Sequence, residues 1–333
     1  METITNAVLE QNSALRPTAF DDFTGQARIK QQLKILVGGA SSRHEALPHM
    51  IFHGPHGLGK TTLAHIMARA MGVSASITSG PTMEKPGDVV GLLNSLSPND
   101  ILFIDEIHRM PIEVAETLYS AMEDFRIDII IGQGVEAKTV PLTLPSFTLI
   151  GATTQMGKIA PPLQSRFLHA FRMESYKPDE LTAIAQRSSK LLNLDLPTEA
   201  ALLLAKAARG TPRIVNNLVR WTRDFANSEG RTGADAELVK QALDVKGVEE
   251  DGLDQTDLRI LTTLIQVFKG GPVGLDSLAS AAGEDAVTVE ENHEPFLLGQ
   301  GYWQRTPRGR QATELAWKRI GVKMPGAVQG ALI

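Results

Sequence analysis

Short apolar runs alternate with amphipathic stretches along the first half of the chain. Each run has the length and the bounding turn residues of a buried strand, and the stretches between them have apolar residues at helical spacing. Strands that alternate with helices predict parallel βαβ units, so we expect an α/β fold with helices on both faces of a parallel sheet. The expected strands are Met50–Phe52, Ser76–Thr78, Ile101–Ile104 and Thr148–Ala152, and the expected helices are Ala27–Val37, Thr62–Met71 and Ile112–Met122.

One segment of this half has a different pattern. Ile127–Ile131 and Ala137–Leu144 are two strand-like runs on either side of the glycine-rich stretch Gly132-Gln133-Gly134. Two strands joined by a short glycine-containing turn predict a β-hairpin, here inserted into the α/β domain.

The second half of the chain has helical periodicity first and a short strand pattern near its end. Leu181–Leu192, Thr198–Ala208 and Arg213–Asn227 predict a small helical domain. Beyond the acidic stretch Glu249–Gly252, three further helices precede a strand-turn-strand pattern, which together predict a winged helix, a variant of the helix-turn-helix. Those elements are Asp257–Phe268, Leu275–Ala282, Val287–Leu298 and the strands within Gly301–Arg310.

These patterns divide the chain into three expected domains between two tails. The expected segments are a tail over 1–16, an α/β domain over 17–177 with its hairpin at 127–144, a helical domain over 178–250, a winged helix over 251–325 and a tail over 326–333.

Composition narrows the class of protein. The 333 residues are 42% hydrophobic, which is enough for sizeable cores, and no apolar run approaches the length of a membrane span. The first residues lack the basic and apolar regions of a signal peptide. The chain has no cysteine, which excludes disulfides and thiolate metal sites. We therefore expect a cytoplasmic protein without a membrane partner. The net charge of -5 argues against binding nucleic acid over the whole surface.

The stretch Gly54-Pro55-His56-Gly57-Leu58-Gly59-Lys60-Thr61 fits the phosphate-loop pattern G-x-x-x-x-G-K-[ST] at every fixed position. An expected strand precedes it and an expected helix follows it, which is the context that the motif requires. Glycines allow the backbone N–H groups to face a β-phosphate, and the helix N-terminus adds partial positive charge. We expect Gly57, Gly59, Lys60, Thr61 and Thr62 to bind the phosphates of ATP, with the Thr61 hydroxyl as a ligand of Mg²⁺.

Two carboxylates end the apolar strand Ile101–Ile104. Asp105 is expected to hold Mg²⁺, and Glu106 is expected to polarise the water that attacks the γ-phosphorus. Another apolar strand ends in Thr153-Thr154, where a hydroxyl can orient that water or sense the γ-phosphate. A threonine pair at a strand end is also what strand propensity alone produces.

Two arginines are candidates for catalytic coupling. Arg166 follows two prolines and an apolar anchor, as a surface arginine acting on a neighbouring subunit's site would. Arg213, in Gly210-Thr211-Pro212-Arg213, begins a helix from which it could reach the phosphates and convert hydrolysis into a domain rotation. An ordinary surface arginine and an ordinary helix-start arginine explain the same residues.

The expected wing is basic. Gly301–Ile320 contains five basic residues against the single acid Glu314. We expect Arg305, Arg308 and Arg310 to face DNA phosphates, whereas Tyr302 and Trp303 are expected to pack beneath the wing.

These motifs together resemble the RuvB family, the AAA+ motors that drive branch migration of Holliday junctions in bacteria. The resemblance extends from about Leu15 to Gly321. It rests on long strings rather than on the phosphate loop alone: Leu15-Arg16-Pro17, Gly57–His65, Ile77–Pro81, Leu102–Arg109, Ala121–Phe125, Gly210–Ile214 and Gln304–Arg310.

The resemblance implies a role for individual residues. It implies an AAA+ P-loop core, a helical AAA+ lid and a C-terminal winged helix. Thr154 would be sensor 1, Arg166 the arginine finger and Arg213 sensor 2, while Arg305 and Arg310 would contact DNA. The residues implied near the nucleotide are Leu15, Arg16, Glu123, Asp124, Phe125 and Tyr176.

The chain departs from the family pattern at several positions. His56 stands where the family usually has a second proline, at a position with no required side chain, so little effect is expected there. We expect weaker support of the Arg166 side chain and altered DNA affinity and partner choice. The departures behind that expectation are Gln155, Gln164, Ser165, Ala286 and the hairpin tip Gln133–Glu136.

The activity implied by the resemblance is that of an ATP-dependent DNA motor for recombination and repair. It implies a homohexameric ring that pulls duplex DNA with ATP and Mg²⁺, a RuvA-like junction-binding partner docked on the 127–144 hairpin, and room for a RuvC-like resolvase. Two alternatives stay open: a slowly hydrolysing paralogue that acts as a scaffold, and a clamp-loader-type ATPase, against which the arginine-rich wing argues.

Overall fold

The computed structural model describes residues 14–131 and 138–324, which form two compact units. The first unit comprises the residues up to Leu194 together with Gly210–Val219, and the second comprises Asp195–Arg209 and the residues from Arg220 onward. The boundary between the two units lies inside the expected helical domain. The predicted domain boundaries therefore stay a prediction.

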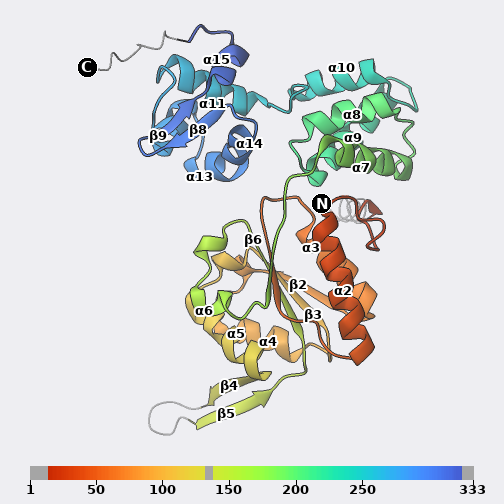
Figure 1. Ribbon diagram of the computed structural model, residues 1–333, viewed down its shortest axis with the longest axis vertical. Coiled ribbons are helices and arrows are strands. Elements are labelled where there is room, and N and C mark those ends of the chain that lie inside the picture. Colours follow the sequence, from red (N-terminus) through yellow and green to blue (C-terminus); the bar gives the residue numbers. More distant parts are fainter. Residues whose placement is uncertain (1–13, 132–137, 325–333) are drawn as a thin grey trace. The chain divides into compact units, whose positions relative to one another are not determined.

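A five-stranded parallel sheet forms the centre of the first unit, in the order β2-β3-β6-β1-β7 (Figure 1). The four predicted strands are all present, and the α/β class is confirmed. The edge strand β7 was not predicted, because only Phe171 of its four residues is buried and the apolar signal is weak. The strands are β1 (Met50–His53), β2 (Ala75–Ser79), β3 (Ile101–Asp105), β6 (Thr148–Thr153) and β7 (His169–Arg172).

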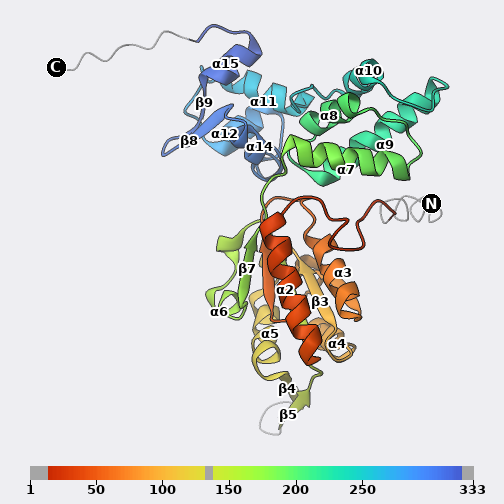
Figure 2. The same ribbon diagram turned by 45° about the vertical axis from the view of Figure 1, so that its right-hand side comes forward.

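Alternate residues of the central strands face two helical layers. Ile51, Leu102 and Leu149 join a buried cluster with α4 and α5, whereas α2 and α3 pack together and α3 contacts the sheet. Figure 2 shows α2 running in front of the strands. Helix α4 was not predicted. The helices are α2 (Ala27–Arg43), α3 (Lys60–Met71), α4 (Pro86–Asn94), α5 (Ile112–Asp124), α6 (Pro161–Gln164) and α7 (Pro178–Leu191), with 3₁₀ turns at Gly80–Thr82, Ile107–Arg109 and Met156–Lys158.

The predicted hairpin is present as a separate two-stranded antiparallel sheet. Strand β4 (Arg126–Ile131) follows α5 directly and pairs with β5 (Lys138–Thr143), with Ile127 opposite Leu142. The expected turn Gly132-Gln133-Gly134 and the hairpin tip at 133–136 lie outside the described residues.

The second unit begins with helices of the expected helical domain. Helix α8 (Thr198–Ala207) packs on α10 (Ala236–Lys246), which was not predicted as a separate helix. Helix α9 (Pro212–Ser228) starts in the first unit and ends in the second.

The winged helix is built around a buried cluster that contains Leu261, Leu264, Trp303 and Trp317. The segment predicted as one helix, Val287–Leu298, is instead an α-turn, a π-helical turn and a second α-helix. Pro295 explains the break, since it has no N–H to continue the helical ladder. The elements are α11 (Gln255–Gln266), α12 (Leu275–Ala282), α13 (Ala286–Thr288), the π-helix Val289–His293, α14 (Glu294–Gly299), β8 (Trp303–Thr306), β9 (Gly309–Ala312) and α15 (Glu314–Ile320).

Tyr302 and Trp303 are buried in this cluster, as expected for residues beneath the wing. Within the part of the chain that the structure describes, every helix is too short or too polar to cross a lipid bilayer.

Candidate functional site

The phosphate loop connects β1 to α3 at the carboxyl edge of the sheet. Gly57 and Gly59 have φ angles of 75° and 103°, which L-residues with side chains rarely adopt, so the glycines of the motif are required by the backbone. Lys60 is the first residue of α3, and its Nζ donates hydrogen bonds to the carbonyl oxygens of Gly54 at 2.7 Å and Pro55 at 2.9 Å. The loop therefore holds a buried cation beside its own backbone.

Burial lowers the pKa of Lys60 below its ordinary value, and the nearby carboxylates of Asp105 and Glu106 partly offset that shift. In the low-dielectric surroundings of a buried site, an ammonium attracts an anionic group more strongly than it does in water. The arrangement suits a polyphosphate.

The predicted catalytic carboxylates lie at the same edge because β3 and β6 are neighbours and β6 also pairs with β1. Asp105 ends β3, and its Oδ1 accepts the N–H of Glu106 at 3.0 Å. Thr154, just after β6, donates its hydroxyl to Glu106 Oε2 at 3.4 Å. The structure thus brings together the predicted base and the predicted sensor, which are 48 residues apart in sequence.

Two histidines that were not predicted as site residues surround the Glu106 carboxylate. His108 Nδ1 lies 3.3 Å from Oε2, and His56 Nδ1 lies 3.6 Å from Oε1. His108 also hydrogen-bonds the Thr153 hydroxyl at 2.9 Å. Oε1 is buried and has no hydrogen-bond partner among the described residues, so it is the oxygen whose lone pairs remain available to take a proton. His56 lies inside the phosphate-loop motif and His108 lies two residues after Glu106, so proximity in sequence was the available signal.

The residues at this edge of the sheet suit a nucleotide that carries a magnesium ion. A Cβ on Gly59 would lie 3.0 Å from the Phe23 ring, and one on Gly57 would lie 2.7 Å from Thr211 Cγ2, so the two glycines form a narrow backbone cradle. Thr61 and Asp105 offer the hydroxyl and carboxylate oxygens that Mg²⁺ prefers. The residues therefore fit both the nucleotide and the metal.

Residues predicted beside the base of the nucleotide lie next to the loop. The Tyr176 hydroxyl donates to the Leu58 carbonyl at 3.1 Å, and burial raises the pKa of that phenol. Leu15 is buried, with its carbonyl bound by Arg187 Nη1 at 2.8 Å, whereas Arg16 is exposed. Phe23 was missed, because an aromatic in an irregular segment carries no motif.

Arg213 lies against the phosphate loop. Its backbone N–H donates to the Gly57 carbonyl at 3.3 Å, and its Cβ would be 3.0 Å from a Cβ at Gly57. The Gly210–Arg213 segment, at the start of α9, therefore touches the loop that is expected to hold the phosphates.

Arg166 belongs to a different group of residues. Its guanidinium pairs with Glu123 Oε2 at 3.0 Å, donates to the Tyr119 and Pro162 carbonyls, and lies 4.5 Å from the centroid of the Tyr119 ring. These supports come from α5 and α6. Gln164 and Ser165 were expected to weaken the support of the Arg166 side chain. A salt bridge from Glu123, on α5, supports its guanidinium instead.

The predicted nucleotide contacts Glu123, Asp124 and Phe125 are not brought to the phosphate loop of their own chain. Phe125 directly follows α5 and packs against His49 and Phe147, which precede β1 and β6. Those residues lie at the amino edge of the parallel sheet, and the phosphate loop lies at the carboxyl edge. Within one chain, Glu123 and Arg166 therefore form a second charged group apart from the loop.

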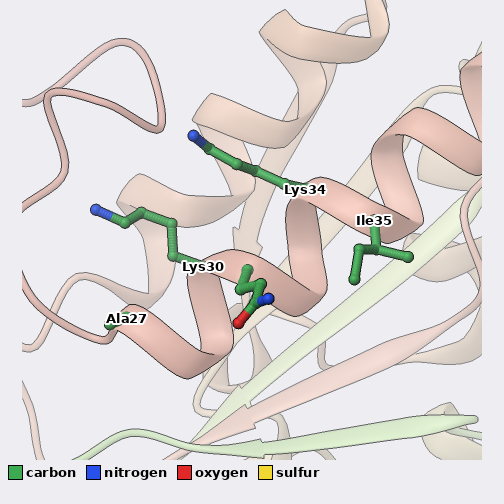
Figure 3. Close-up of a pocket in the computed structure, with 5 residues that line it drawn as sticks. Ala27, Lys30, Lys34 and Ile35 are labelled. Carbon is green, nitrogen blue, oxygen red and sulfur yellow. The ribbon is translucent and has the colours of Figure 1, made fainter.

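Two hollows of about 440 Å³ each lie in the first unit, and neither is at the phosphate loop. One follows the outer side of α2 (Figure 3), where Lys34 pairs with Asp21 at 2.6 Å and Lys30 Nζ donates to the Phe23 carbonyl. The other lies at the amino edge of the sheet and includes His49 and Phe125.

On the wing, two of the three predicted DNA-contact arginines converge on one acid. Arg305 and Arg310 both donate to the carboxylate of Glu294, a residue that was not predicted, while Arg308 is exposed in the turn between β8 and β9. The fold and the site together define an ATPase of the AAA+ P-loop class that carries a winged helix.

Family models refine that class and cover the chain almost from end to end. The model of the Holliday junction DNA helicase RuvB P-loop domain matches residues 15–173, the RuvB AAA lid domain matches 176–249, and the RuvB C-terminal winged helix domain matches 250–321. The chain belongs to the RuvB family.

Relatives and solved structures agree with this assignment. The Holliday junction branch migration complex subunit RuvB of Flavobacterium psychrophilum is 51% identical over 324 residues, covering 97% of this chain and 95% of that protein. The subunit of the same name from Christiangramia forsetii is 51% identical over 319 residues, covering 96% and 93%. The solved Thermotoga maritima RuvB Holliday junction branch migration motor is 40% identical, with a TM-score of 0.85, and covers 94% of this chain and 100% of its own.

Proposed function

We propose that this chain is an ATP-dependent DNA motor that drives branch migration of Holliday junctions. The observation that carries the proposal is the meeting of Lys60, Asp105, Glu106 and Thr154 at one edge of the sheet, with Arg213 against the loop, in a chain that also has an arginine-bearing winged helix. The names of its close relatives support the same activity.

The residues at the sheet edge have complementary roles in hydrolysis. Lys60 and the backbone of the phosphate loop bind the β- and γ-phosphates, and Glu106 accepts a proton from the attacking water through Oε1. Thr61 and Asp105 would hold Mg²⁺, which would supply positive charge beside the phosphates. Thr154 holds Oε2 of the base in place.

We propose that the second charged group acts on a neighbouring subunit. Arg166 lies apart from its own phosphate loop and is supported by Glu123, so it can reach nucleotide only across a subunit interface, as in a hexameric ring. Glu123–Phe125 would face nucleotide in the same way. Arg213 would report hydrolysis as a rotation of the helical domain.

DNA and partner proteins complete the proposal. The arginines of the wing would contact phosphates, which gives recognition of the DNA backbone rather than of sequence. The hairpin of β4 and β5 would dock a RuvA-like junction-binding protein, and a RuvC-like resolvase would act on the same complex. We propose that the protein acts on chromosomal DNA in the cytoplasm.

The first test is ATP hydrolysis by the native protein with and without duplex DNA and a RuvA-like partner, beside the Glu106→Gln variant. We expect stimulation by DNA in the native protein and a loss of about 10² or more in the variant, with nucleotide binding retained. ATP binding without stimulated turnover in the native protein would overturn the motor and favour a scaffold paralogue.

A further inference from the structure

Glu294 is a fully buried carboxylate at the start of α14, in a part of the chain rich in exposed charge. It accepts four hydrogen bonds from two arginines of the wing. Arg305 donates through Nε and Nη2 at 2.8 and 2.7 Å, and Arg310 donates through the same two atoms at 2.9 Å each. One acid thus engages one edge of both guanidinium groups.

Without this acid, the neighbouring positive charges of the two arginines would repel each other. Arg305 on β8 is directly opposite Arg310 on β9 in the strand register, and like charges in opposed positions repel. The carboxylate of Glu294 receives both cations and removes that repulsion. Burial alone would raise the pKa of Glu294, but the hydrogen bonds from Arg305 and Arg310 hold it below its usual value.

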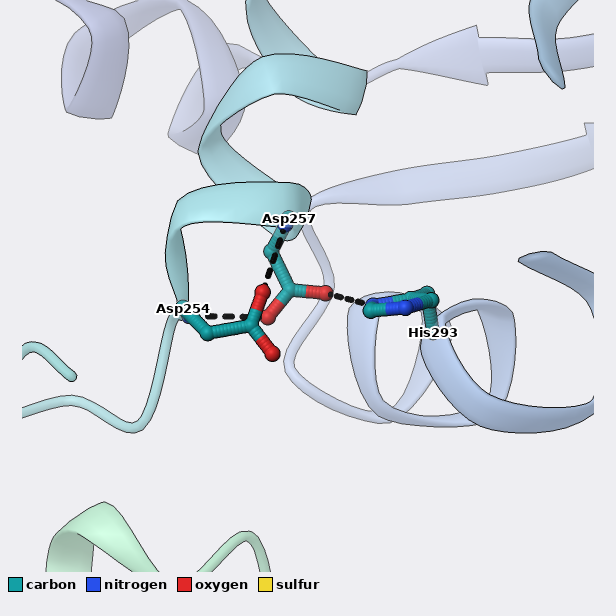
Figure 4. A group of neighbouring side chains, drawn as sticks. All are labelled: Asp254, Asp257 and His293. Carbon is teal, nitrogen blue, oxygen red and sulfur yellow. Dashed lines mark hydrogen bonds and ion pairs between the residues drawn. The ribbon is translucent and has the colours of Figure 1, made fainter. Parts of the chain in front are cut away.

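The backbone that carries Glu294 is itself fixed by buried ion pairs. His293, the preceding residue, bonds Asp257 Oδ1 through Nδ1 at 2.7 Å (Figure 4). Asp257 and Asp254 both pair with Arg209, the latter at 2.7 Å. Because Arg209 pairs with both aspartates and His293 bonds one of them, this cluster is a hydrogen-bonded ion-pair network that joins the π-helix to α11 and to Arg209, two residues after α8.

The two arginines differ in exposure. The side chain of Arg310 is 16% exposed and that of Arg305 is 55% exposed. Glu294 engages Nε and Nη2 of each, so Nη1 is the part of each guanidinium that Glu294 does not bind. A planar donor held on one edge offers its other edge in a fixed direction.

We propose that Glu294 is a positioning residue for DNA binding, which holds Arg305 and Arg310 so that their Nη1 edges meet backbone phosphates. The inference rests on the proposed function, since it assumes that the wing contacts DNA. It has an unusual consequence: neutralising Glu294 adds one positive charge to the wing and nevertheless weakens binding, because the arginines lose their fixed direction.

Glu290 provides a matched control for charge. It is 48% exposed, and its Oε1 lies 4.0 Å from Arg305 Nη2, so Glu290→Gln makes the same charge change beside the same arginine without removing the buried support. Bulk electrostatics predicts that Glu290→Gln and Glu294→Gln both bind DNA more tightly than the native protein. A positioning role predicts instead that Glu294→Gln binds DNA more weakly than the native protein, whereas Glu290→Gln does not.

The experiment is duplex DNA binding by full-length native, Glu290→Gln and Glu294→Gln proteins over a series of salt concentrations. We expect Glu290→Gln to bind as tightly as the native protein or more tightly, and Glu294→Gln to bind about 10-fold more weakly. We also expect the slope of log K against log salt to become shallower by about one to two units for Glu294→Gln, since each lost phosphate contact removes about 0.9. Adding Arg310→Ala to Glu294→Gln should cause little further loss.

Glu294→Asp gives a second measurement that keeps the charge. Aspartate is one methylene shorter than glutamate, so its carboxylate cannot reach both arginines. We therefore expect an intermediate loss of DNA affinity, and a circular dichroism spectrum like that of the native protein. Binding by Glu294→Gln as tight as that of Glu290→Gln, or native affinity in Glu294→Asp, overturns the inference alone. Failure of the native protein to bind duplex DNA overturns the proposed function and this inference with it.

Discussion

Single side chains at the sheet edge are controlled by groups that come from several elements. Glu106 has a left-handed backbone conformation, with φ 47°, and its carboxylate is surrounded by the phosphate loop, the turn after β3 and the end of β6. Oε2 accepts a hydrogen bond from Thr154 and lies 3.3 Å from His108 Nδ1, whereas Oε1 lies 3.6 Å from His56 Nδ1. We therefore expect the side chain at 56 to affect catalysis, unlike the small effect expected from the motif, which places no requirement on it.

We predict that His56→Ala lowers kcat for ATP hydrolysis several-fold and changes KM for ATP by less than twofold. The Nδ1 atom of His56 lies 3.6 Å from Oε1, and the side chain is exposed. Its replacement by alanine therefore removes a neighbour of the predicted base without disturbing a buried core. His56→Asn places an amide near the position of Nδ1 and should restore most of the rate. Steady-state kinetics measures both constants, and equal rates in the native and alanine proteins would contradict the prediction.

His49 is a second residue whose state is set by its neighbours. Its Nδ1 accepts the N–H of Leu149 at 2.8 Å, so Nε2 carries the proton and donates to the Met122 carbonyl at 3.1 Å. Burial lowers the pKa of His49 below 6.5, and the bond to Met122 opposes that shift weakly. The folded protein therefore favours the neutral ring.

We predict that this histidine contributes to acid sensitivity. Because its folded pKa is depressed, its stabilising effect is present above about pH 6.5 and is lost as the pH falls toward the folded pKa. The urea midpoint of the native protein should fall more between pH 7.5 and 5.5 than that of His49→Gln. The exposed His44, changed to Asn, serves as the control and should keep the native pH dependence; parallel curves for native and His49→Gln proteins would refute the assignment.

At the scale of elements, the order of the strands brings the phosphate loop and the ends of β3 and β6 to one edge of the sheet. The Gly210–Arg213 segment, at the start of α9, contacts the loop at that edge. The phosphate loop, β3 and β6 are local patterns that a sequence reveals. The contact of Gly210–Arg213 with Gly57 depends instead on how α9 packs. Two elements escaped prediction for local reasons, since β7 is short and mostly polar and Pro295 divides a continuous helical pattern.

We predict that Gly57→Ala weakens nucleotide binding by at least about 10-fold. Alanine at φ 75° is strained by about 1 kcal/mol, and its Cβ would lie 2.7 Å from Thr211 Cγ2, so the Gly210–Arg213 segment must move away. Gly72→Ala carries similar strain at φ 69° with nothing within 4 Å, and is the matched control. Titration with a fluorescent ATP analogue compares them, and equal affinities would show that backbone strain alone matters.

At the scale of the whole molecule, the predicted catalytic residues form two separate groups in one chain. Arg166 and Glu123 form a salt-bridged group on α5 and α6, whereas Lys60 and Glu106 lie at the carboxyl edge of the sheet. An arginine that acts on a neighbour requires a subunit interface. The separation of these two groups is therefore the feature of the fold that argues for an assembly.

We predict complementation between two inactive variants. Glu106→Gln keeps its arginine and Arg166→Ala keeps its base, so a mixed ring contains sites with a native base and a native arginine from the neighbour. Mixing the two proteins should restore ATP hydrolysis above the sum of the separate rates. Mixing Arg166→Ala with Arg166→Ala,Glu106→Gln supplies no arginine and should restore nothing; recovery there, or none in the first mixture, would contradict a trans-acting arginine.

The sequence alone determined the features that depend on neighbouring residues. The spacing of Gly57, Gly59 and Lys60, the carboxylate pair after an apolar strand, and the alternation of strands with helices follow from backbone geometry and burial over short stretches. These were enough to predict the α/β class, the winged helix and the residues that meet at the edge of the sheet. The long matching strings identified the family, because they span nearly the whole chain.

Only the tertiary structure decided which distant groups meet. The order of the strands brings Thr154 to Glu106, the packing of α9 brings Arg213 to Gly57, and the fold of the wing buries Glu294 between Arg305 and Arg310. No local pattern marks Glu294, since a glutamate at a helix start is usually solvated. Its role comes from burial and from two cations on strands that pair only in the folded domain.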